Sequence, residues 1–265
     1  MDFTLIKYKL LLKSLLEEGY GFQTFEQFLQ NPASNVVILR HDVDLKANNS
    51  LETAKIENSL GIVGSYYFRV IPQSYNLEII KQIAELGHEI GYHYETMDSV
   101  SEKFRSEEER IDEAYRLFCE HLGEFRKRYP VKTICMHGSP KSAFDNKDIW
   151  TKYNYKKLGI IGEPYFDIDF DKFFYLTDTG RCWNGYRFSV RDKMRQQESW
   201  VKQGLVFRTT LDIVKAVKTK KLPRQVMITV HPQRWTNNYL EWFKELVAQR
   251  LKNLVKWGLI RFEHR

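Results

Sequence analysis

Apolar runs alternate with amphipathic segments along most of the chain, which predicts strands that alternate with helices. The clearest strand candidates lie at 36–41, 64–70, 88–95, 131–138 and 225–231, and less regular ones lie near 158, at 165–176 and near 205. Connections in which each strand is followed by a helix produce parallel sheets with right-handed crossovers. We therefore expect an α/β fold with a parallel sheet that is open or closed into a barrel.

Helical spacing of apolar residues predicts what covers this sheet. Leucines recur at helical spacing over 3–18, Gly19 and Gly21 end that helix, and FQTFEQFL begins another. Further helices are predicted at 48–60, 76–86, 101–128, 211–219 and 237–256. We expect a single domain over 1–265, with N-terminal helices in 1–35, a barrel core in 36–232 and a C-terminal helix in 233–265.

Composition narrows the class of partner. The 265 residues are 43% apolar and carry 41 Lys and Arg against 34 Asp and Glu, a formal charge of +7. The basic residues are dispersed, with short clusters at 126–128 and 218–221. Because the sequence has no concentrated basic stripe and no zinc-finger spacing, we do not expect a nucleic-acid partner. The sequence carries no signal for an oligomeric state.

The cysteines and the apolar segments suggest a compartment. Cys119, Cys135 and Cys182 are odd in number and far apart, which argues against a disulfide framework and for a reducing environment. Charged residues interrupt the apolar stretch at 1–21, so it does not resemble a signal peptide, and no later stretch is long enough to span a bilayer. We expect a cytoplasmic protein with no integral membrane segment, and transient contact with a membrane surface stays open.

Charged residues at the end of the first predicted strand suggest a site. The run VVILRHDVD at 36–44 leads directly into Asp42 and Asp44. Alternation along a strand puts both carboxylates on one side, where one could bind a cation while the other takes a proton. Burying such charges is costly unless they hold a metal or each other. The alternative is a pair of solvated loop acids that contact Arg40 or Lys46.

Histidines follow the same pattern, since His41, His93, His137 and His231 all lie at or near predicted strand ends. In a barrel, these ends form one ring. An Asp and two or three His could then surround a cation such as Zn²⁺, whose catalytic sites keep three protein ligands and one open position. A single His at a strand end is more commonly a structural residue.

The order of these motifs resembles a known family. HDVD after a strand, then GIVGSYYFRV, ELGHEIGYHYE and a late strand that ends in VMITVHPQRW are similar to the NodB-type polysaccharide deacetylases. The resemblance covers about residues 36–232 and implies a deformed (β/α) barrel of about seven parallel strands, here with an N-terminal helical cover. It also implies dependence on a divalent metal, for which we expect Zn²⁺.

The resemblance implies roles for individual residues. It makes Asp42 the general base, Asp44 and His93 metal ligands, and His231 the acid that protonates the leaving group. The family's second motif ends in another histidine ligand, but this chain has Met97 there, and a thioether is a poor ligand for such a cation.

The third metal ligand must then come from elsewhere. The family's third motif carries an Arg followed closely by Pro, and here CMHGSP places His137 at the expected position of the Arg. We hypothesise that His137 replaces the missing ligand, with Glu95 as the second choice.

Residues with weaker signals are candidates for substrate binding. Arg69 ends the strand SYYFRV and could hold Asp42 or a substrate anion. The segment DTGRCWNG at 178–185 contains Asp178, Arg181 and Trp183, which fit sugar recognition and fit an ordinary surface turn equally well.

The resemblance implies a metal-dependent carbohydrate N-deacetylase, a hydrolase that acts on the amide bond of an N-acetylated sugar, and the choice of substrate rests on the resemblance alone. The expected partner is an N-acetylated carbohydrate, such as a nucleotide- or lipid-linked precursor of a surface glycan. One alternative is a barrel that lost its metal through Met97 and binds a glycan or a partner without catalysis. Another is a metal amidohydrolase for small non-sugar C–N bonds.

Overall fold

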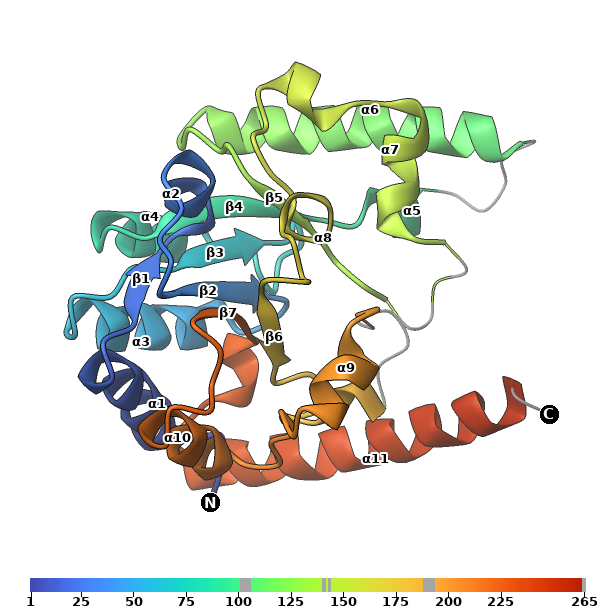
Figure 1. The fold of residues 1–265 in the computed structure, drawn as a ribbon. Coiled ribbons are helices and arrows are strands. Elements are labelled where there is room, and N and C mark those ends of the chain that lie inside the picture. Colours follow the sequence, from blue (N-terminus) through green and yellow to red (C-terminus); the bar gives the residue numbers. More distant parts are fainter. Residues whose placement is uncertain (101–105, 140–141, 143, 188–193, 264–265) are drawn as a thin grey trace.

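A computed structural model describes residues 1–100, 106–139, 142, 144–187 and 194–263. Its strands form one parallel, seven-stranded sheet in the order β5-β4-β3-β2-β7-β6, and β1 pairs with the start of β2 (Figure 1). The strands are β1 (Gly21–Gln23), β2 (Val36–Val43), β3 (Ser65–Phe68), β4 (Glu89–Tyr94), β5 (Ile134–Met136), β6 (Phe174–Thr177) and β7 (Gln225–Val230).

The sheet curls without closing through a complete ring of strand pairs. Among the described residues, β5 and β6 lie at opposite ends of the sheet order, and a single bridge between Thr133 and Gly162 extends the β5 edge. The predicted α/β fold, a deformed barrel of about seven parallel strands, is confirmed. Its strands therefore present their carboxyl ends along one curved rim.

Helices flank the sheet as the β-then-α pattern predicts. The longer ones are α1 (Leu5–Glu17), α3 (Ala47–Asn58), α4 (Leu77–Glu85), α6 (Glu107–Arg126), α10 (Thr210–Lys218) and α11 (Tyr239–Glu263). The shorter ones are α2 (Phe25–Gln30), α5 (Thr96–Ser99), α7 (Ile149–Lys152), α8 (Pro164–Asp167) and α9 (Gln197–Lys202). Among the described helices, none is both long and apolar enough to cross a membrane.

The N-terminal cover and two predicted strands differ from expectation. Tyr155–Leu158 form a 3₁₀ helix where the sequence predicts a strand near 158, and an isolated bridge at Gly162 follows. The helix predicted at FQTFEQFL begins later, because residues 21–23 pair with β2 as β1 and Thr24 caps α2 with a capping box. The strand predicted near 205 is absent from the described structure. Leu205 and Phe207 bury their side chains without a ladder partner, and Thr209 then caps α10.

Strand β2 lies at the centre of the sheet and positions the candidate site. Each of its residues is buried, as expected for a parallel strand covered on both faces. Alternation places Arg40 and Asp42 on one face and His41 on the other. His41 accordingly lies away from the rim, where Nε2 is 2.9 Å from Glu57 Oε1 and the ring stacks on Tyr66.

Candidate metal and catalytic site

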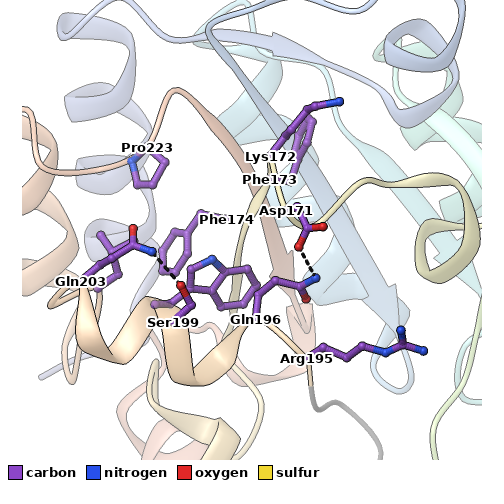
Figure 2. A pocket seen from close by; sticks show the side chains of 11 residues that line it. Asp171, Lys172, Phe173, Phe174, Arg195, Gln196, Ser199, Gln203 and Pro223 are labelled. Atoms are coloured by element: carbon purple, nitrogen blue, oxygen red, sulfur yellow. Dashed lines mark hydrogen bonds between the residues drawn. The ribbon is translucent and has the colours of Figure 1, made fainter.

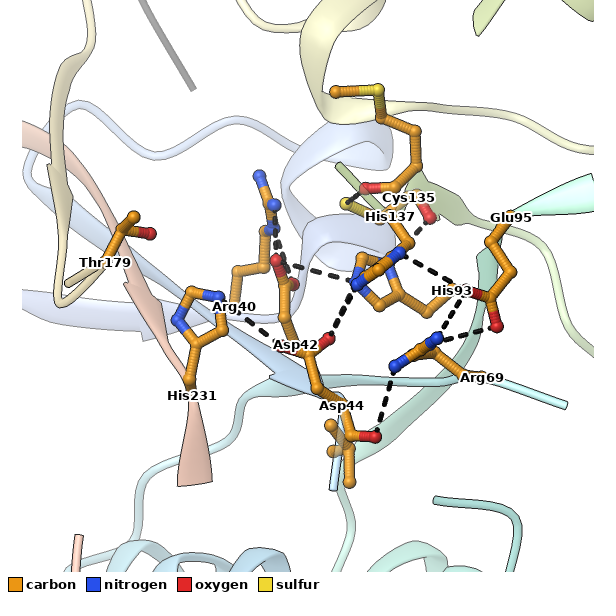
Figure 3. Close-up of polar contacts among 12 residues, drawn as sticks. Arg40, Asp42, Asp44, Arg69, His93, Glu95, Cys135, His137, Thr179 and His231 are labelled. Atoms are coloured by element: carbon orange, nitrogen blue, oxygen red, sulfur yellow. Dashed lines mark hydrogen bonds and ion pairs between the residues drawn. The ribbon is translucent and has the colours of Figure 1, made fainter. Parts of the chain in front are cut away.

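Polar side chains from neighbouring strand ends meet at the rim of the sheet (Figure 3). Asp42 is the second-last residue of β2 and Asp44 directly follows the strand, while His93 lies near the end of β4. His137 directly follows β5 and His231 directly follows β7. The structure thus brings together the residues for which the sequence predicted catalytic and metal-binding roles.

Asp44 is the centre of this cluster. Its Oδ1 lies 3.5 Å from His93 Nε2 and 3.6 Å from His137 Nε2. Its Oδ2 lies 3.9 Å from His231 Nε2 and accepts a hydrogen bond of 3.1 Å from Gln233. Burial alone would raise the pKa of Asp44, but the neighbouring His93, His137 and His231 outweigh burial and hold that pKa well below its usual range.

The surroundings of Asp44 Oδ1 fit a metal ion. In the described part of the chain, this buried oxygen has no hydrogen-bond partner, an arrangement that costs free energy unless something binds there. Ligand atoms about 2.0–2.1 Å from a tetrahedral Zn²⁺ are separated by roughly 3.4 Å. The 3.5 and 3.6 Å separations from His93 Nε2 and His137 Nε2 are close to that value.

His93 is oriented for this role by the neighbouring strand. Its Nδ1 lies 2.9 Å from the carbonyl oxygen of Cys135, because β4 pairs with β5 in a register that aligns the two residues. An Nδ1–H that donates to this carbonyl leaves the Nε2 lone pair directed at Asp44. Metal-binding histidines are commonly fixed in this way by a partner on the other ring nitrogen.

His137 is oriented by Glu95. The backbone N–H of His137 donates to Tyr94 O over 2.8 Å, which continues the pairing of β5 with β4. Its Nδ1 then lies 3.3 Å from Glu95 Oε2, and this ion pair raises the pKa of His137 against the opposing effect of burial.

Glu95 is itself held by Arg69, whose Nε and Nη2 donate to its two oxygens over 3.0 and 2.5 Å. Burial would raise the pKa of Glu95, but His137 and Arg69 outweigh it, so that the pKa lies at about 2. Arg69 thus pairs with Glu95, whereas the sequence interpretation had offered Asp42 as its partner.

Two groups of possible ligands have all their ligand atoms within 4.8 Å of one another in the described residues. They are Asp42 with His93 and Cys135, and Glu95 with Asp98 and His137. Neither contains Asp44. Both oxygens of Asp42 are bound by Arg40, and both oxygens of Glu95 are bound by Arg69. We therefore favour a site around Asp44, because its Oδ1 has no hydrogen-bond partner in the described residues and lies near one histidine of each group.

Arg40 holds Asp42 in a bidentate ion pair, with Nε and Nη2 2.8 and 2.6 Å from the two carboxylate oxygens. The guanidinium is 2% exposed and lies 5.1 Å from the centre of the Tyr165 ring. Burial would raise the pKa of Asp42, but Arg40 and then His93 outweigh it and the pKa is about 2. Asp42 is therefore ionised at neutral pH.

Asp178 lies behind His231. The pairing of β6 with β7 continues past Thr177, where the N–H of Asp178 donates to Thr229 O, and this places the two residues side by side. The carboxylate lies 2.5 Å from His231 Nδ1 and also accepts hydrogen bonds from Trp235 Nε1 and Arg234 Nη1, both 2.7 Å. Burial would raise the pKa of Asp178, but Arg234 and His231 lower it.

These contacts correct the expectation that Asp178 binds substrate. The residue is 0% exposed, and its oxygens are engaged by protein donors. Its position suits it to orient His231, because an Nδ1–H held by the carboxylate leaves Nε2 facing the rim.

The structure also corrects the predicted sugar-binding roles of Arg181 and Trp183. Arg181 is 7% exposed, donates to Trp242 O over 2.7 Å and lies 4.7 Å from the centre of the Trp242 ring. Trp183 is 4% exposed, donates to Thr210 Oγ1 over 3.0 Å and packs in the hydrophobic core. The segment 178–185 has the composition of a surface turn, but Arg181 packs against α11 and Trp183 packs against α10.

A substitution at Trp183 tests this correction. Trp183→Leu is expected to lower the free energy of unfolding by about 2–4 kcal/mol, because it removes buried aromatic volume and one hydrogen bond. The KM for an N-acetylated sugar should stay unchanged. Denaturant unfolding and steady-state kinetics measure both, and a raised KM at unchanged stability would restore a substrate-binding role.

Met97 lies in the core and not at the rim. It is 1% exposed within a hydrophobic cluster, and its backbone N–H donates to Asn146 Oδ1 over 3.0 Å. The amide group of Asn146 also donates to His137 O over 2.7 Å. This contact ties the segment that would carry the family's second histidine to the segment that carries His137. Pro140 of the predicted third motif lies outside the described residues.

Sequence reasoning missed the residues that surround the catalytic candidates. Gln233, Arg234 and Trp235 all contact Asp44 or Asp178, and they follow His231 in HPQRW. Pro232 starts a short 3₁₀ turn there, which folds these side chains back on the rim. A histidine at a strand end followed directly by several hydrogen-bond donors, as in HPQRW, is a sequence pattern that could have identified these supporting residues.

The candidate site is separate from a surface pocket of about 550 Å³ (Figure 2). That pocket is lined by α9 and by residues that precede β6 and β7, including Lys172, Phe173, Trp200 and Pro223. Since the candidate site lies at the opposite, carboxyl ends of these strands, none of its residues lines this pocket.

Comparison with known proteins identifies similar folds. No family model and no curated protein matches the chain. Among solved structures, it is similar to a wild-type CE4 family pseudoenzyme from Bacillus anthracis, with 12% identity, a TM-score of 0.41 and coverage of 84% of this chain and 63% of that one. A mutant of a CE4 family pseudoenzyme with restored enzymatic activity gives 12% identity, a TM-score of 0.42 and coverage of 84% and 65%.

These structures belong to the CE4 family, which contains the NodB-type deacetylases that the sequence motifs resemble. The match spans slightly less than two thirds of the length of those chains. At this similarity, the likeness concerns the fold alone.

Proposed function

We propose that this protein is a metal-dependent hydrolase that removes the acetyl group from an N-acetylated sugar. The observation that carries the proposal is the buried Oδ1 of Asp44, which has no hydrogen-bond partner among the described residues and lies 3.5 and 3.6 Å from the Nε2 atoms of His93 and His137. An ionised carboxylate, Asp42, and a carboxylate-bound histidine, His231, lie beside it. The choice of an N-acetylated sugar follows the motif resemblance.

Asp44, His93 and His137 would hold the metal. When bound, a Zn²⁺ ion would supply the chemistry of lowering the pKa of water and polarising a carbonyl oxygen. Contacts to the other ring nitrogens keep these ligands in place, since the carbonyl of Cys135 fixes the ring of His93 and Glu95 fixes that of His137. Arg69 acts indirectly, because it holds Glu95, which in turn contacts His137.

Asp42 and His231 would divide the proton transfers. Asp42 takes a proton from the attacking water as its oxygen bonds to the acetyl carbon, and Arg40 keeps that carboxylate ionised and fixed. As the C–N bond breaks, His231 Nε2 gives a proton to the departing nitrogen. The products are acetic acid and the free amino sugar, which leave as acetate and the ammonium form once one proton passes between them. The proton held by Asp42 returns to His231 through solvent, so atoms and charge balance.

Metal content and acetate release test the proposal together. Purified protein should bind about one equivalent of Zn²⁺ and release acetate from an N-acetylhexosamine. Protein that binds no divalent metal would instead favour a non-catalytic barrel that binds a glycan or a partner. Protein that binds metal but hydrolyses cyclic ureides and not N-acetylhexosamines would favour a small-molecule amidohydrolase.

The role of Asp178 gives a separate prediction. Asp178→Asn should lower kcat by about 10²–10⁴-fold, because an amide cannot hold His231 in the required tautomer. Metal affinity should stay unchanged, since no oxygen of Asp178 is placed to bind the ion. Steady-state kinetics and metal titration check this expectation, and unchanged kcat would remove His231 from the mechanism or Asp178 from its support.

A further inference from the structure

Helix α11 exposes an apolar stripe on the surface. Leu240, Phe243, Val247, Leu251 and Leu254 are 68, 51, 41, 60 and 65% exposed. We call these residues the α11 stripe. The helix runs along one side of the molecule, and its C-terminal part extends beyond the neighbouring elements (Figure 1). A stripe of large exposed apolar side chains commonly marks an interaction surface.

The opposite side of α11 is fixed to the rest of the protein. Trp242 Nε1 donates to Asp2 O over 2.6 Å, and Trp242 O accepts a hydrogen bond from Arg181. One residue before the end of the stripe, Asn253 donates to Gly180 O over 2.8 Å. Since both ends of this stretch are anchored, the helix cannot turn the stripe inward without breaking these contacts.

The spacing of the stripe is symmetric about Val247. Successive members are three, four, four and three residues apart, so the pattern is the same in both directions. The stripe is about 21 Å long at 1.5 Å per residue. Its positions form a narrow seam, as in helices that pair with another helix, and not the broad apolar face of a helix that covers a core.

We propose that the α11 stripe binds the α11 stripe of a second copy of this chain, with the two helices antiparallel. This arrangement places Leu240 opposite the partner's Leu254, Phe243 opposite the partner's Leu251, and Val247 on the two-fold axis opposite its counterpart. Such an interface is isologous, which means that both copies use the same surface. Each copy therefore covers the stripe of the other, and assembly stops at the dimer.

Charge along the helix favours the antiparallel direction. Glu241 and Glu245 lie in the first half of the stripe, while Arg250 and Lys252 lie in the second half, and Lys244 is the exception. Glu241 also lies 3.7 Å from Lys46 of the same chain, so Glu245 is the acidic residue of this half with no ion pair among the described residues. An antiparallel partner brings the acidic half of one helix to the basic half of the other. Over 240–254 the helix has three basic and two acidic residues, a smaller basic excess than in helices that bind anionic membranes.

The dimer should be weak. Stable protein interfaces use about 20–30 residues from each partner, far more than the members of the stripe. We therefore expect monomer and dimer to exchange, with the dimer fraction rising with concentration over about 1–100 µM.

Sedimentation velocity on the full chain tests the proposal. Val247→Glu places like charges against each other on the two-fold axis and should weaken dimerisation at least about tenfold. Val247→Lys should do the same, and an equimolar mixture of the two variants should dimerise again through the opposite charges. The control is Leu77→Glu at the start of α4, which is 37% exposed and outside the stripe.

Several results would overturn the proposal. They are a wild-type protein that stays monomeric up to about 100 µM, a dimer that Val247→Glu leaves intact, and variants that do not recover when mixed. Binding of anionic phosphatidylserine vesicles by a monomeric wild-type protein, lost in Val247→Glu, would overturn it in favour of a membrane surface. Because Val247 lies outside the rim, metal content in Val247→Glu should match wild type whatever the outcome.

Discussion

Replacing Asp42 by Asn is expected to lower turnover by about 10²–10⁴-fold while the metal stays bound. The substitution keeps the size of the side chain but removes a proton acceptor that lies 3.9 Å from His93 Nε2. Asp44, His93 and His137 keep their positions, so metal affinity should change little. Steady-state kinetics and metal titration of the same preparation measure both quantities.

The same substitution leaves the buried Arg40 without a charged partner. Removing one member of a buried ion pair commonly costs about 3–5 kcal/mol, so the variant should also unfold at lower denaturant concentration. Adding Arg40→Gln removes the unpaired cation and should recover part of this stability without recovering turnover. Asp169→Asn, at an exposed carboxylate that pairs with Lys172, provides the matched control. Turnover near the wild-type value in a folded Asp42→Asn protein would exclude Asp42 as the base.

The convergence of the site could be predicted because it depends on local rules. Alternation along a strand places Asp42 on the face opposite His41, and parallel strands with helical crossovers bring their carboxyl ends to one rim. A sequence that puts acids and histidines after several apolar strands therefore places them together without any knowledge of packing. The same rules locate His93, His137 and His231 at the rim.

The partners of these residues could not be predicted in the same way. Arg40 and Arg69 both lie near strand ends, and the choice of Asp42 or Glu95 as partner depends on side-chain direction and on the register of β3 against β4. Asp178 follows β6, for which the sequence gives only an irregular apolar stretch at 165–176. The end of this strand, and with it the position of Asp178 beside His231, could not be predicted. Amphipathic side chains such as Trp183 fit a surface or a core equally well, and only packing decides between them.

Under the proposed function, the placement of Met97 and His137 explains how a metal could be held although Met97 stands where the resembled motif has a histidine. Met97 packs in the core, and Asn146 ties its backbone to that of His137 on the adjacent strand. A histidine from β5 thereby reaches Asp44 from the neighbouring strand end. In this interpretation, the ligand is supplied by a different strand while the ion remains beside Asp44.

Replacing His137 by Ala should lower Zn²⁺ affinity by more than about 100-fold, because it removes a metal ligand, whereas loss of an outer-shell partner costs about 10–100-fold. Glu95→Gln should therefore have the smaller effect, since Glu95 only orients His137. Titration with Zn²⁺ against a competing chelator measures these affinities. His121→Ala is the matched control, because its ring contacts Tyr92 and lies away from the ligands. Full affinity in His137→Ala, or a larger loss in Glu95→Gln, would identify Glu95 as the third ligand in place of His137.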